Sequence, residues 1–137
     1  LVSWSVFIVI LNMSENEIGT KILDAAFNLH RELGPGLLES SYHRCLCYLL
    51  EQRGLKFKTE LSVPLKFRNV YLDCGYKLDL LVEDKVIVEL KAVEEMKDVF
   101  QAQLLTYMKL TGCKLGYLIN FNTKLLKDGI KRLVRGL

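Results

Sequence analysis

The chain has 137 residues, of which 50% are hydrophobic and 26% are charged, and its formal net charge is +3. This length suits one hydrophobic core and is short for two domains, while the composition excludes an intrinsically disordered chain. Residues 109–137 hold seven Lys or Arg and one acid, which leaves twelve basic and fifteen acidic residues in 1–108. The basic C-terminal part suits a phosphate-backbone partner, or it is the solvated face of a terminal helix.

Residues 1–12 are apolar but too short to span a bilayer, and we expect no membrane partner. Because Met13 and Ser14 look like a natural start, we interpret residues 1–12 as a non-native or disordered N-terminal extension. The alternative is an extra strand packed on the domain. A single domain is expected to comprise residues 13–137.

The cysteines predict no zinc site, because they form no C-x-x-C pair and have no histidine-rich partner spacing. They are Cys45, Cys47, Cys74 and Cys113. We expect reduced thiols in a cytoplasmic protein.

Two helices are expected first. Residues 14–17 form a capping box, and apolar residues at helical spacing follow it at Ile18, Ile22, Ala25, Leu29 and Leu33. Residues 34–36, Gly-Pro-Gly, end this helix. A second helix is predicted from about Leu38 to Arg53, and Gly54 ends it.

An antiparallel hairpin is predicted for residues 76–91. Two apolar runs rich in β-branched residues flank Glu83-Asp84-Lys85, which is typical of a three-residue loop. In that register Val82 faces Val86. One face of the hairpin would then be wholly apolar and lie on a core, with Leu78, Leu80, Val82, Val86, Val88 and Leu90.

The same register places Asp79 directly opposite Glu89 on the other face. Like charges so placed destabilise a sheet, so this pair indicates a bound divalent cation or, equally well, a solvated face on which Lys77 and Lys91 neutralise the acids. A two-residue turn would instead place the two acids on opposite faces.

The remaining elements alternate between strands and helices. We predict strands at 56–67 and 70–82 with a turn at 68–69, a helix at 93–111, a strand at 115–121 and an amphipathic helix at 124–135. The buried positions expected in the helix at 93–111 include Val99, Leu104, Tyr107 and Met108. That helix can act as a crossover, which would make the strand at 115–121 parallel to its neighbour.

The spacing of Asp79 and Glu89-Leu90-Lys91 resembles the catalytic signature of the PD-(D/E)XK nuclease superfamily. Gly36, Glu39 and Tyr42 form a GxxExxY pattern, and the stretches VIVELKAV, QAQLLTYMKLTG and LGYLINF also resemble the bacterial family named after it. The resemblance extends from about Met13 to the C-terminus. It implies an α/β (α+β) fold with a restriction-endonuclease-like core, in which a central mixed four-stranded sheet is flanked by helices in the order ααβββαβα.

The resemblance implies a metal-dependent site. The residues that would hold Mg²⁺ or Mn²⁺ are Asp79, Glu89, the Leu90 carbonyl and Glu39, and hard cations prefer such oxygen ligands. Lys91 would position or deprotonate a water for attack on a phosphodiester. For Glu39 the alternative is a favourable charge at a helix N-terminus.

Gln103 and Tyr107 are spaced i, i+4 and resemble the QxxxY element of RecB-like nucleases, which borders the active site. With them the implied catalytic set is Glu39, Asp79, Glu89, Lys91, Gln103 and Tyr107. The alternatives are a core aromatic for Tyr107 and a helix-surface amide for Gln103.

The implied function is a metal-dependent nuclease acting on DNA, in repair or defence, as a homodimer or within a larger complex. Fold and motif do not fix a substrate, and two other hypotheses stay open. One is a non-catalytic nucleic-acid-binding or partner-regulating domain, and the other is a plain subunit of a larger complex.

Overall fold

The computed structural model describes residues 12–137, and the expectations for residues 1–11 lie outside this range. No helix in the described range is both long and apolar enough to cross a membrane. The elements, in chain order, are α2 (Glu15–Leu33), α3 (Glu39–Gln52), β1 (Phe57–Ser62), β2 (Leu65–Phe67), β3 (Val70–Leu72), β4 (Lys77–Val82), β5 (Val86–Lys91), α4 (Asp98–Thr111), β6 (Leu115–Asn120), the 3₁₀ turn η1 (Leu126–Gly129) and β7 (Ile130–Val134).

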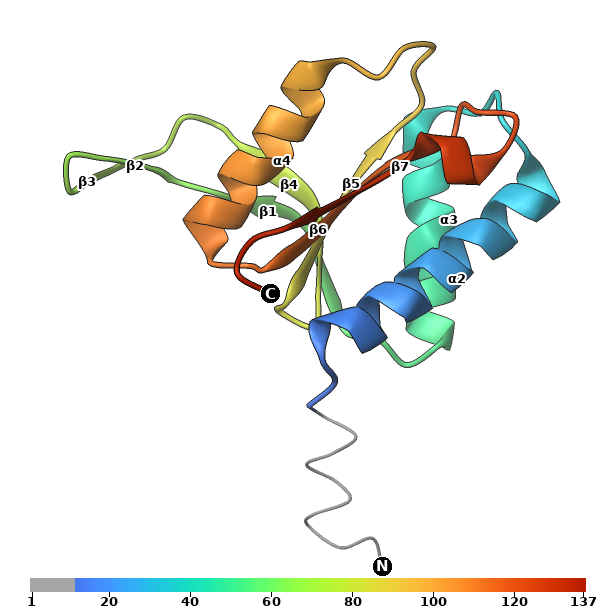
Figure 1. Ribbon diagram of the computed structural model, residues 1–137, viewed down its shortest axis with the longest axis horizontal. Helices are drawn as coiled ribbons and strands as arrows, with labels where there is room; N and C mark the ends of the chain where they lie inside the picture. The colour runs from blue at the N-terminus through green and yellow to red at the C-terminus, as the bar shows by residue number, and fades with distance from the viewer. Residues whose placement is uncertain (1–11) are drawn as a thin grey trace, which may run out of the picture.

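A mixed sheet in the order β1-β4-β5-β6-β7 forms the middle layer (Figure 1). Strands β4 and β5 are antiparallel, whereas β5 and β6 are parallel because α4 makes the crossover between them. Helices α2 and α3 cover one face of the sheet and α4 covers the other. The predicted α/β class and mixed sheet are confirmed, but residues 12–137 contribute five strands to it rather than four.

The fifth strand comes from a segment that we predicted wrongly as a helix, residues 124–135. Its second half is β7, which pairs antiparallel with β6 so that Ile119 lies opposite Ile130 and Leu115 opposite Val134. Strand β6 is buried along its whole length, so its N–H and C=O groups on this side need partners. Backbone pairing with β6 therefore outweighs the local helical spacing of the apolar residues.

The strands expected at 56–67 and 70–82 each divide into two. Their outer parts leave the main sheet as the β2–β3 hairpin, which we call the arm and which projects beyond α4 (Figure 1). Arg68 and Asn69 have φ values of 49° and 66°, as in the tight two-residue turns that favour hairpins. Pro64 and Gly75 lie where the arm joins β1 and β4, and both are residues that interrupt strands.

Helix α4 starts at Asp98 rather than at Val93. The buried Asn120 side chain explains the delay, because its amide oxygen accepts from Val93 N–H (3.1 Å) and its amide nitrogen donates to Val93 C=O (2.9 Å). These bonds hold the chain extended after β5. Leu104, Tyr107 and Met108 are buried as predicted, but Val99 is 63% exposed.

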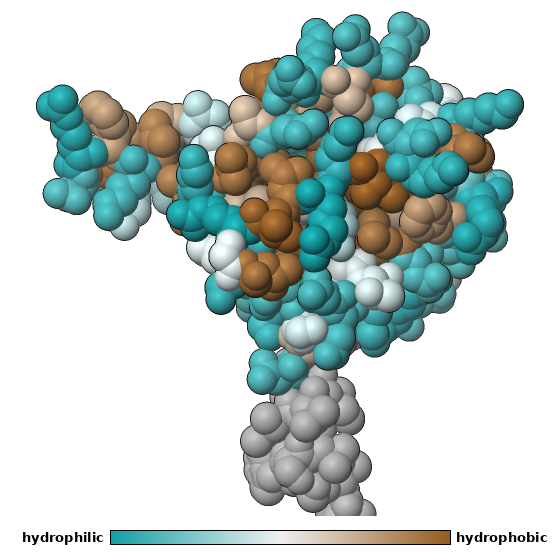
Figure 2. Space-filling model, viewed as in Figure 1, coloured by the Kyte–Doolittle hydropathy of each residue, from teal (hydrophilic) through white to brown (hydrophobic). Residues whose placement is uncertain are grey.

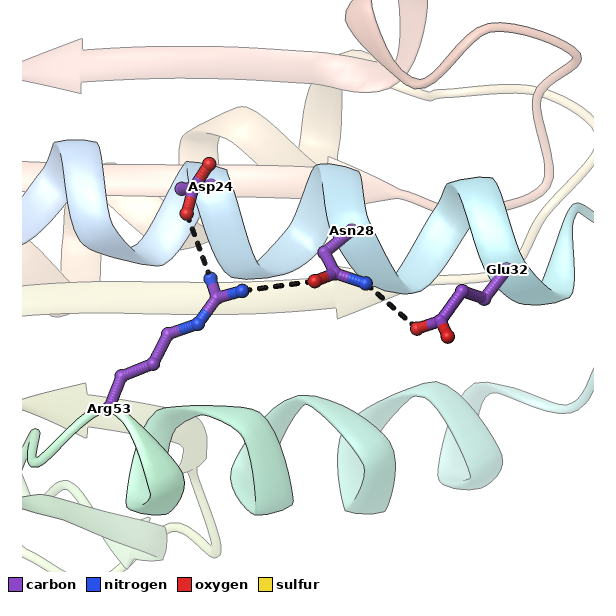
Figure 3. Close-up of polar contacts among 4 residues, drawn as sticks. All are labelled: Asp24, Asn28, Glu32 and Arg53. Atoms are coloured by element: carbon purple, nitrogen blue, oxygen red, sulfur yellow. Dashed lines mark hydrogen bonds and ion pairs between the residues drawn. The ribbon is translucent and has the colours of Figure 1, made fainter.

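A local cap begins α2, and one polar chain links α2 to the end of α3. Ser14 caps α2 by accepting from Glu17 N–H at 3.2 Å. Arg53, which follows α3, lies 3.2 Å from Asp24 and donates to Asn28 at 3.1 Å, and Asn28 donates in turn to Glu32 at 2.8 Å (Figure 3). All four cysteines are free thiols.

Candidate active site

The acidic pair lies where the β4–β5 ladder opens. Val82 faces Val86 and the pairing continues to Leu80 and Val88, which confirms the three-residue loop. Beyond that point carboxylates take over the backbone bonds: Asp79 N–H donates to Glu89 Oε1 at 3.0 Å, and Leu90 N–H donates to Asp79 Oδ2 at 2.9 Å. Each acid is thus fixed by the backbone of the opposite strand.

Strand β4 is irregular at Asp79. Leu80 packs under α2 and α3, but Leu78, two residues away, packs with the cluster under α4. Our prediction that Leu78 shares the apolar face of Leu80 is therefore wrong. Glu60, opposite on β1, has φ 50° and is skipped in the pairing, and such irregularities re-aim side chains. Asp79 accordingly lines a small cleft of about 170 Å³ with Glu39 and His43.

Burial makes the acidic pair electrostatically unfavourable. Glu89 is 6% exposed, and burial together with the nearby Asp79 charge raises its pKa to about 8, although Lys91 acts in the opposite direction. Burial and Asp79 also raise the pKa of Glu39. Two carboxylates that cannot both ionise comfortably are relieved by a proton or by a metal cation.

Lys91 ends β5 two residues after Glu89, so both side chains project from the same face of the strand. Its ammonium lies 4.3 Å from the centroid of the Phe100 ring, a cation–π contact that restrains the side chain. Phe100 belongs to the first turn of α4. Sequence reasoning overlooked Phe100.

Gln103 and Tyr107 lie on α4 beside the acids. Gln103 Nε2 donates to the Tyr107 hydroxyl at 3.1 Å. Burial, and after it the Glu89 charge, raises the pKa of Tyr107, which locates this hydroxyl within the electrostatic reach of the acidic pair. Tyr107 belongs to the core under α4 and Gln103 is half-buried, so neither is a free surface side chain.

The GxxExxY residues shape the loop that leads into α3. The buried Tyr42 hydroxyl donates to Gly34 C=O at 2.6 Å and accepts from Leu37 N–H at 3.2 Å. Gly36 has φ +100°, which suits glycine. The loop is thereby held against α3, and Glu39 begins that helix facing Asp79 across the cleft.

His43 and Asn120 are polar neighbours to which the sequence analysis gave no role. His43 Nε2 lies 3.3 Å from Asp79 C=O, one turn after Glu39. Asn120 lies beside Lys91 in the parallel ladder. A polar residue that ends a buried apolar strand, as Asn120 does in LGYLIN, is the signal that could have identified it.

The donor set fits a hard divalent cation. Asp79 and Glu89 supply carboxylates, and the Leu90 carbonyl points to the same side of β5 as its N–H, toward Asp79. Within residues 12–137 no three His, Cys, Asp or Glu side chains form a metal-binding group. Glu39 lines the cleft with Asp79, and its role as a ligand stays a prediction. Mg²⁺ commonly needs only one or two carboxylates besides water and substrate phosphate.

A family model described as the PD-(D/E)XK nuclease superfamily matches residues 16–133 of the chain. The match runs from α2 into β7 and includes every candidate site residue named above. No curated protein and no solved structure shows significant similarity to the chain.

Proposed function

Because the chain belongs to the PD-(D/E)XK nuclease superfamily, we propose that it hydrolyses phosphodiester bonds in DNA with Mg²⁺ or Mn²⁺ bound at Asp79, Glu89 and the Leu90 carbonyl. The observation that carries the proposal is the opening of the β4–β5 ladder, where two carboxylates are fixed side by side and Lys91 follows on the same face as Glu89.

Each residue has a separate task. Asp79 and Glu89 would hold the cation, and the chemistry it would supply is polarisation of the scissile phosphate and a lowered pKa of a water. Lys91 directs its ammonium toward the attacking water and orients it, while Phe100 limits the freedom of the Lys91 side chain. Gln103 fixes the Tyr107 hydroxyl next to Glu89, where it can donate a hydrogen bond to a phosphate oxygen.

Glu39 is proposed as an outer ligand that reaches the cation through water. We also propose that the chain belongs to the bacterial GxxExxY family. The bond from the Tyr42 hydroxyl to Gly34 C=O and the positive φ of Gly36, which shape the loop before Glu39, support this proposal. A DNA repair or defence role in the cytoplasm, as a homodimer or within a larger complex, completes the proposal.

Thermal unfolding with and without Mn²⁺, together with cleavage of labelled DNA, tests the site. Wild type should melt higher with metal, since a ligand at a hundredfold excess over Kd stabilises by about 2.7 kcal/mol, and Asp79→Asn should abolish both the stabilisation and cleavage. The matched control is Asp84→Asn, which removes the same charge from the exposed loop at the other end of the hairpin. It should retain both.

Glu39→Gln separates two roles for the GxxExxY carboxylate. An outer-ligand role predicts weaker Mn²⁺ binding without a loss of metal-free stability, because burial and Asp79 already disfavour the Glu39 charge. A helix-terminal charge effect instead predicts a loss of about 0.3–1 kcal/mol with metal affinity intact.

A non-catalytic nucleic-acid-binding domain is the second candidate, favoured by the basic composition of residues 109–137, which hold seven Lys or Arg and one acid. If wild type shows neither stabilisation by metal nor metal-dependent cleavage, this candidate replaces the nuclease.

A further inference from the structure

A groove of about 390 Å³ runs between α4 and the root of the arm. Its walls are mainly apolar and aromatic, with Tyr76 and Leu65 on the arm side and Val99 and Phe100 on the helix side. Tyr76 is 42% exposed, and its ring meets Tyr107 edge-on with the centroids 6.4 Å apart. The groove therefore offers accessible aromatic surface that no described part of the protein covers.

The groove is continuous with the candidate active site. Gln103 and Tyr107 line it and also border the acidic pair, while Phe100 lines it and carries the Lys91 ammonium over its ring. A part of the substrate that lies in the groove would thus be close, along the same molecule, to the phosphate that is cleaved. Flat aromatic walls with one half-buried amide match a nucleobase, which stacks on rings and forms hydrogen bonds along its edge.

A base can reach this groove only when it is unpaired. Bases of an intact duplex are stacked in its interior, and an enzyme pays an unstacking cost to extract one, a cost that is smallest for a strand that is already single. A groove that holds one base would therefore favour a single strand over a duplex.

The arm extends the groove with rings and cations in alternation. Phe67 and Tyr71 are 60% and 68% exposed; Arg68 lies 5.4 Å from the Phe67 ring and Lys66 lies 5.8 Å from the Tyr71 ring. Figure 2 shows hydrophobic and hydrophilic residues side by side along this projection. Residues 61–72 contain no acid, so the arm can accept phosphates as well as bases.

A DNA strand that leaves the active site away from the arm, toward the loop between β5 and α4, meets a less favourable charge. The loop between β5 and α4 carries the exposed acids Glu94 and Glu95. Charge thus favours a strand that leaves the active site along the groove toward the arm.

We propose that the groove and the arm bind an unpaired DNA strand, with one base in the groove next to the scissile phosphate and the following nucleotides on the arm. The inference rests on the proposed function and names its substrate class, single-stranded DNA or an unpaired DNA end. Tyr76 and Phe100 stack on the base, Lys66 and Arg68 contact phosphates, and Phe67 and Tyr71 offer further stacking surfaces.

Binding is measured by fluorescence anisotropy in EDTA, so that it does not depend on metal or cleavage. The probes are a labelled oligothymidylate of about twenty nucleotides, longer than one strand-binding site usually needs, and a duplex of equal length. Tyr76→Ala and Tyr71→Ala should each weaken single-strand binding about 5- to 150-fold, the range that corresponds to the loss of one stacked base. Val99→Glu, which adds a negative charge to the wall of the groove, should also weaken it. The matched control is Tyr48→Ala, which removes an exposed ring from α3 and should change nothing.

Equal affinity for single strand and duplex, or an equal loss in Tyr48→Ala, would overturn the proposal. It also fails if the arm variants bind DNA normally but change the sedimenting mass of the protein, because the arm would then be a protein contact. Cleavage in Mn²⁺ separates the two claims. If the protein cleaves a duplex and Tyr76→Ala does not change the rate, the nuclease proposal stands and the groove proposal fails. If single-strand binding depends on the groove but no DNA is cleaved, the groove proposal stands and the nuclease proposal fails.

Discussion

Nineteen of the described residues form the buried cluster on the α2–α3 side of the sheet, whereas nine form the cluster under α4. Helices α2 and α3 cover the first side and α4 covers the second (Figure 1). Most of the proposed chemistry lies on the second side, where Lys91 contacts Phe100 and Gln103 contacts Tyr107.

This difference shows how one small domain can place a stable core on one side of its sheet and a substrate-accessible site on the other. The α2–α3 side buries enough apolar area to hold β5 rigidly, and a rigid strand can present fixed polar groups. The α4 side leaves Val99 and Tyr76 exposed along the groove, so a substrate can reach the end of β5. Substitutions near the site on the α4 side should therefore lower activity more than stability, whereas substitutions in the α2–α3 cluster should lower stability more than activity.

Lys91→Ala should give the largest functional effect. Loss of a positioned group that handles the attacking water costs about 10²–10⁴-fold in rate, while the lost cation–π contact should reduce the free energy of unfolding by no more than about 1 kcal/mol. The measurements are single-turnover cleavage and urea unfolding. Lys77→Ala, an exposed lysine of β4, is the control and should keep its rate. A Lys91→Ala enzyme that unfolds easily but cleaves normally would reverse the proposed division.

Leu46→Ala tests the other side. Leu46 is fully buried in the α2–α3 cluster, and such truncations cost about 2–5 kcal/mol because a cavity remains. The rate per folded molecule should not change. Leu125→Ala, at an exposed position, provides the control with a small loss. A large fall in the rate of the folded fraction would show that the scaffold and the site are not separable.

The local features of both sides could be predicted from the sequence. The β4–β5 register followed from two β-branched runs and a three-residue loop, since interactions only a few residues apart decide such a hairpin. The Ser14 cap of α2 is equally local. The neighbouring positions of Asp79 and Glu89 follow from that register.

Features that depend on distant parts of the chain could not be predicted. Residues 124–135 have helical spacing, but their second half forms β7 because the edge of β6 would otherwise have no backbone partner. The bond from Asn120 to Val93 joins two segments that only the parallel β5–β6 pairing brings together. The re-aimed Leu78 and the arm depend likewise on the irregular β1–β4 pairing near Glu60.

Glu89→Gln should stabilise the metal-free protein at alkaline pH. Because the pKa of Glu89 is raised from the ordinary 4.5 to about 8, the folded state binds more protons than the unfolded state between these values, and wild-type stability should fall as pH rises through that window. Each tenfold change in a proton-binding constant corresponds to about 1.4 kcal/mol, and we expect a gain of at least that order at pH above 8, disappearing toward pH 4.5. Gln can still accept from Asp79 N–H.

Urea unfolding in EDTA across this pH range measures the effect, and Glu83→Gln in the adjacent loop is the control. Saturating Mn²⁺ should reverse the order of the two proteins, because only the wild-type carboxylate gains a cation. A wild type whose stability is flat between about pH 5 and 8, values that bracket most of the window, would show that Glu89 is not a strained acid.

Arg53→Ala should have the smallest effect, although Arg53 contacts both Asp24 and Asn28 in the polar chain of Figure 3. The Asp24 side chain is 72% exposed, so solvent and salt screen the ion pair, and pairs of this kind contribute about 0–1 kcal/mol. The bond to Asn28 adds a similar amount. We expect a loss of about 1 kcal/mol in urea unfolding that shrinks in high salt, with cleavage unchanged. Asp24→Asn isolates the ionic part, since it keeps an oxygen that can accept from Arg53. A salt-independent loss well above about 2 kcal/mol, beyond the range for such pairs, would mean that the buried Nη1 atom of Arg53 depends on Asp24, and that the α2–α3 side is held by polar contacts as much as by its apolar core.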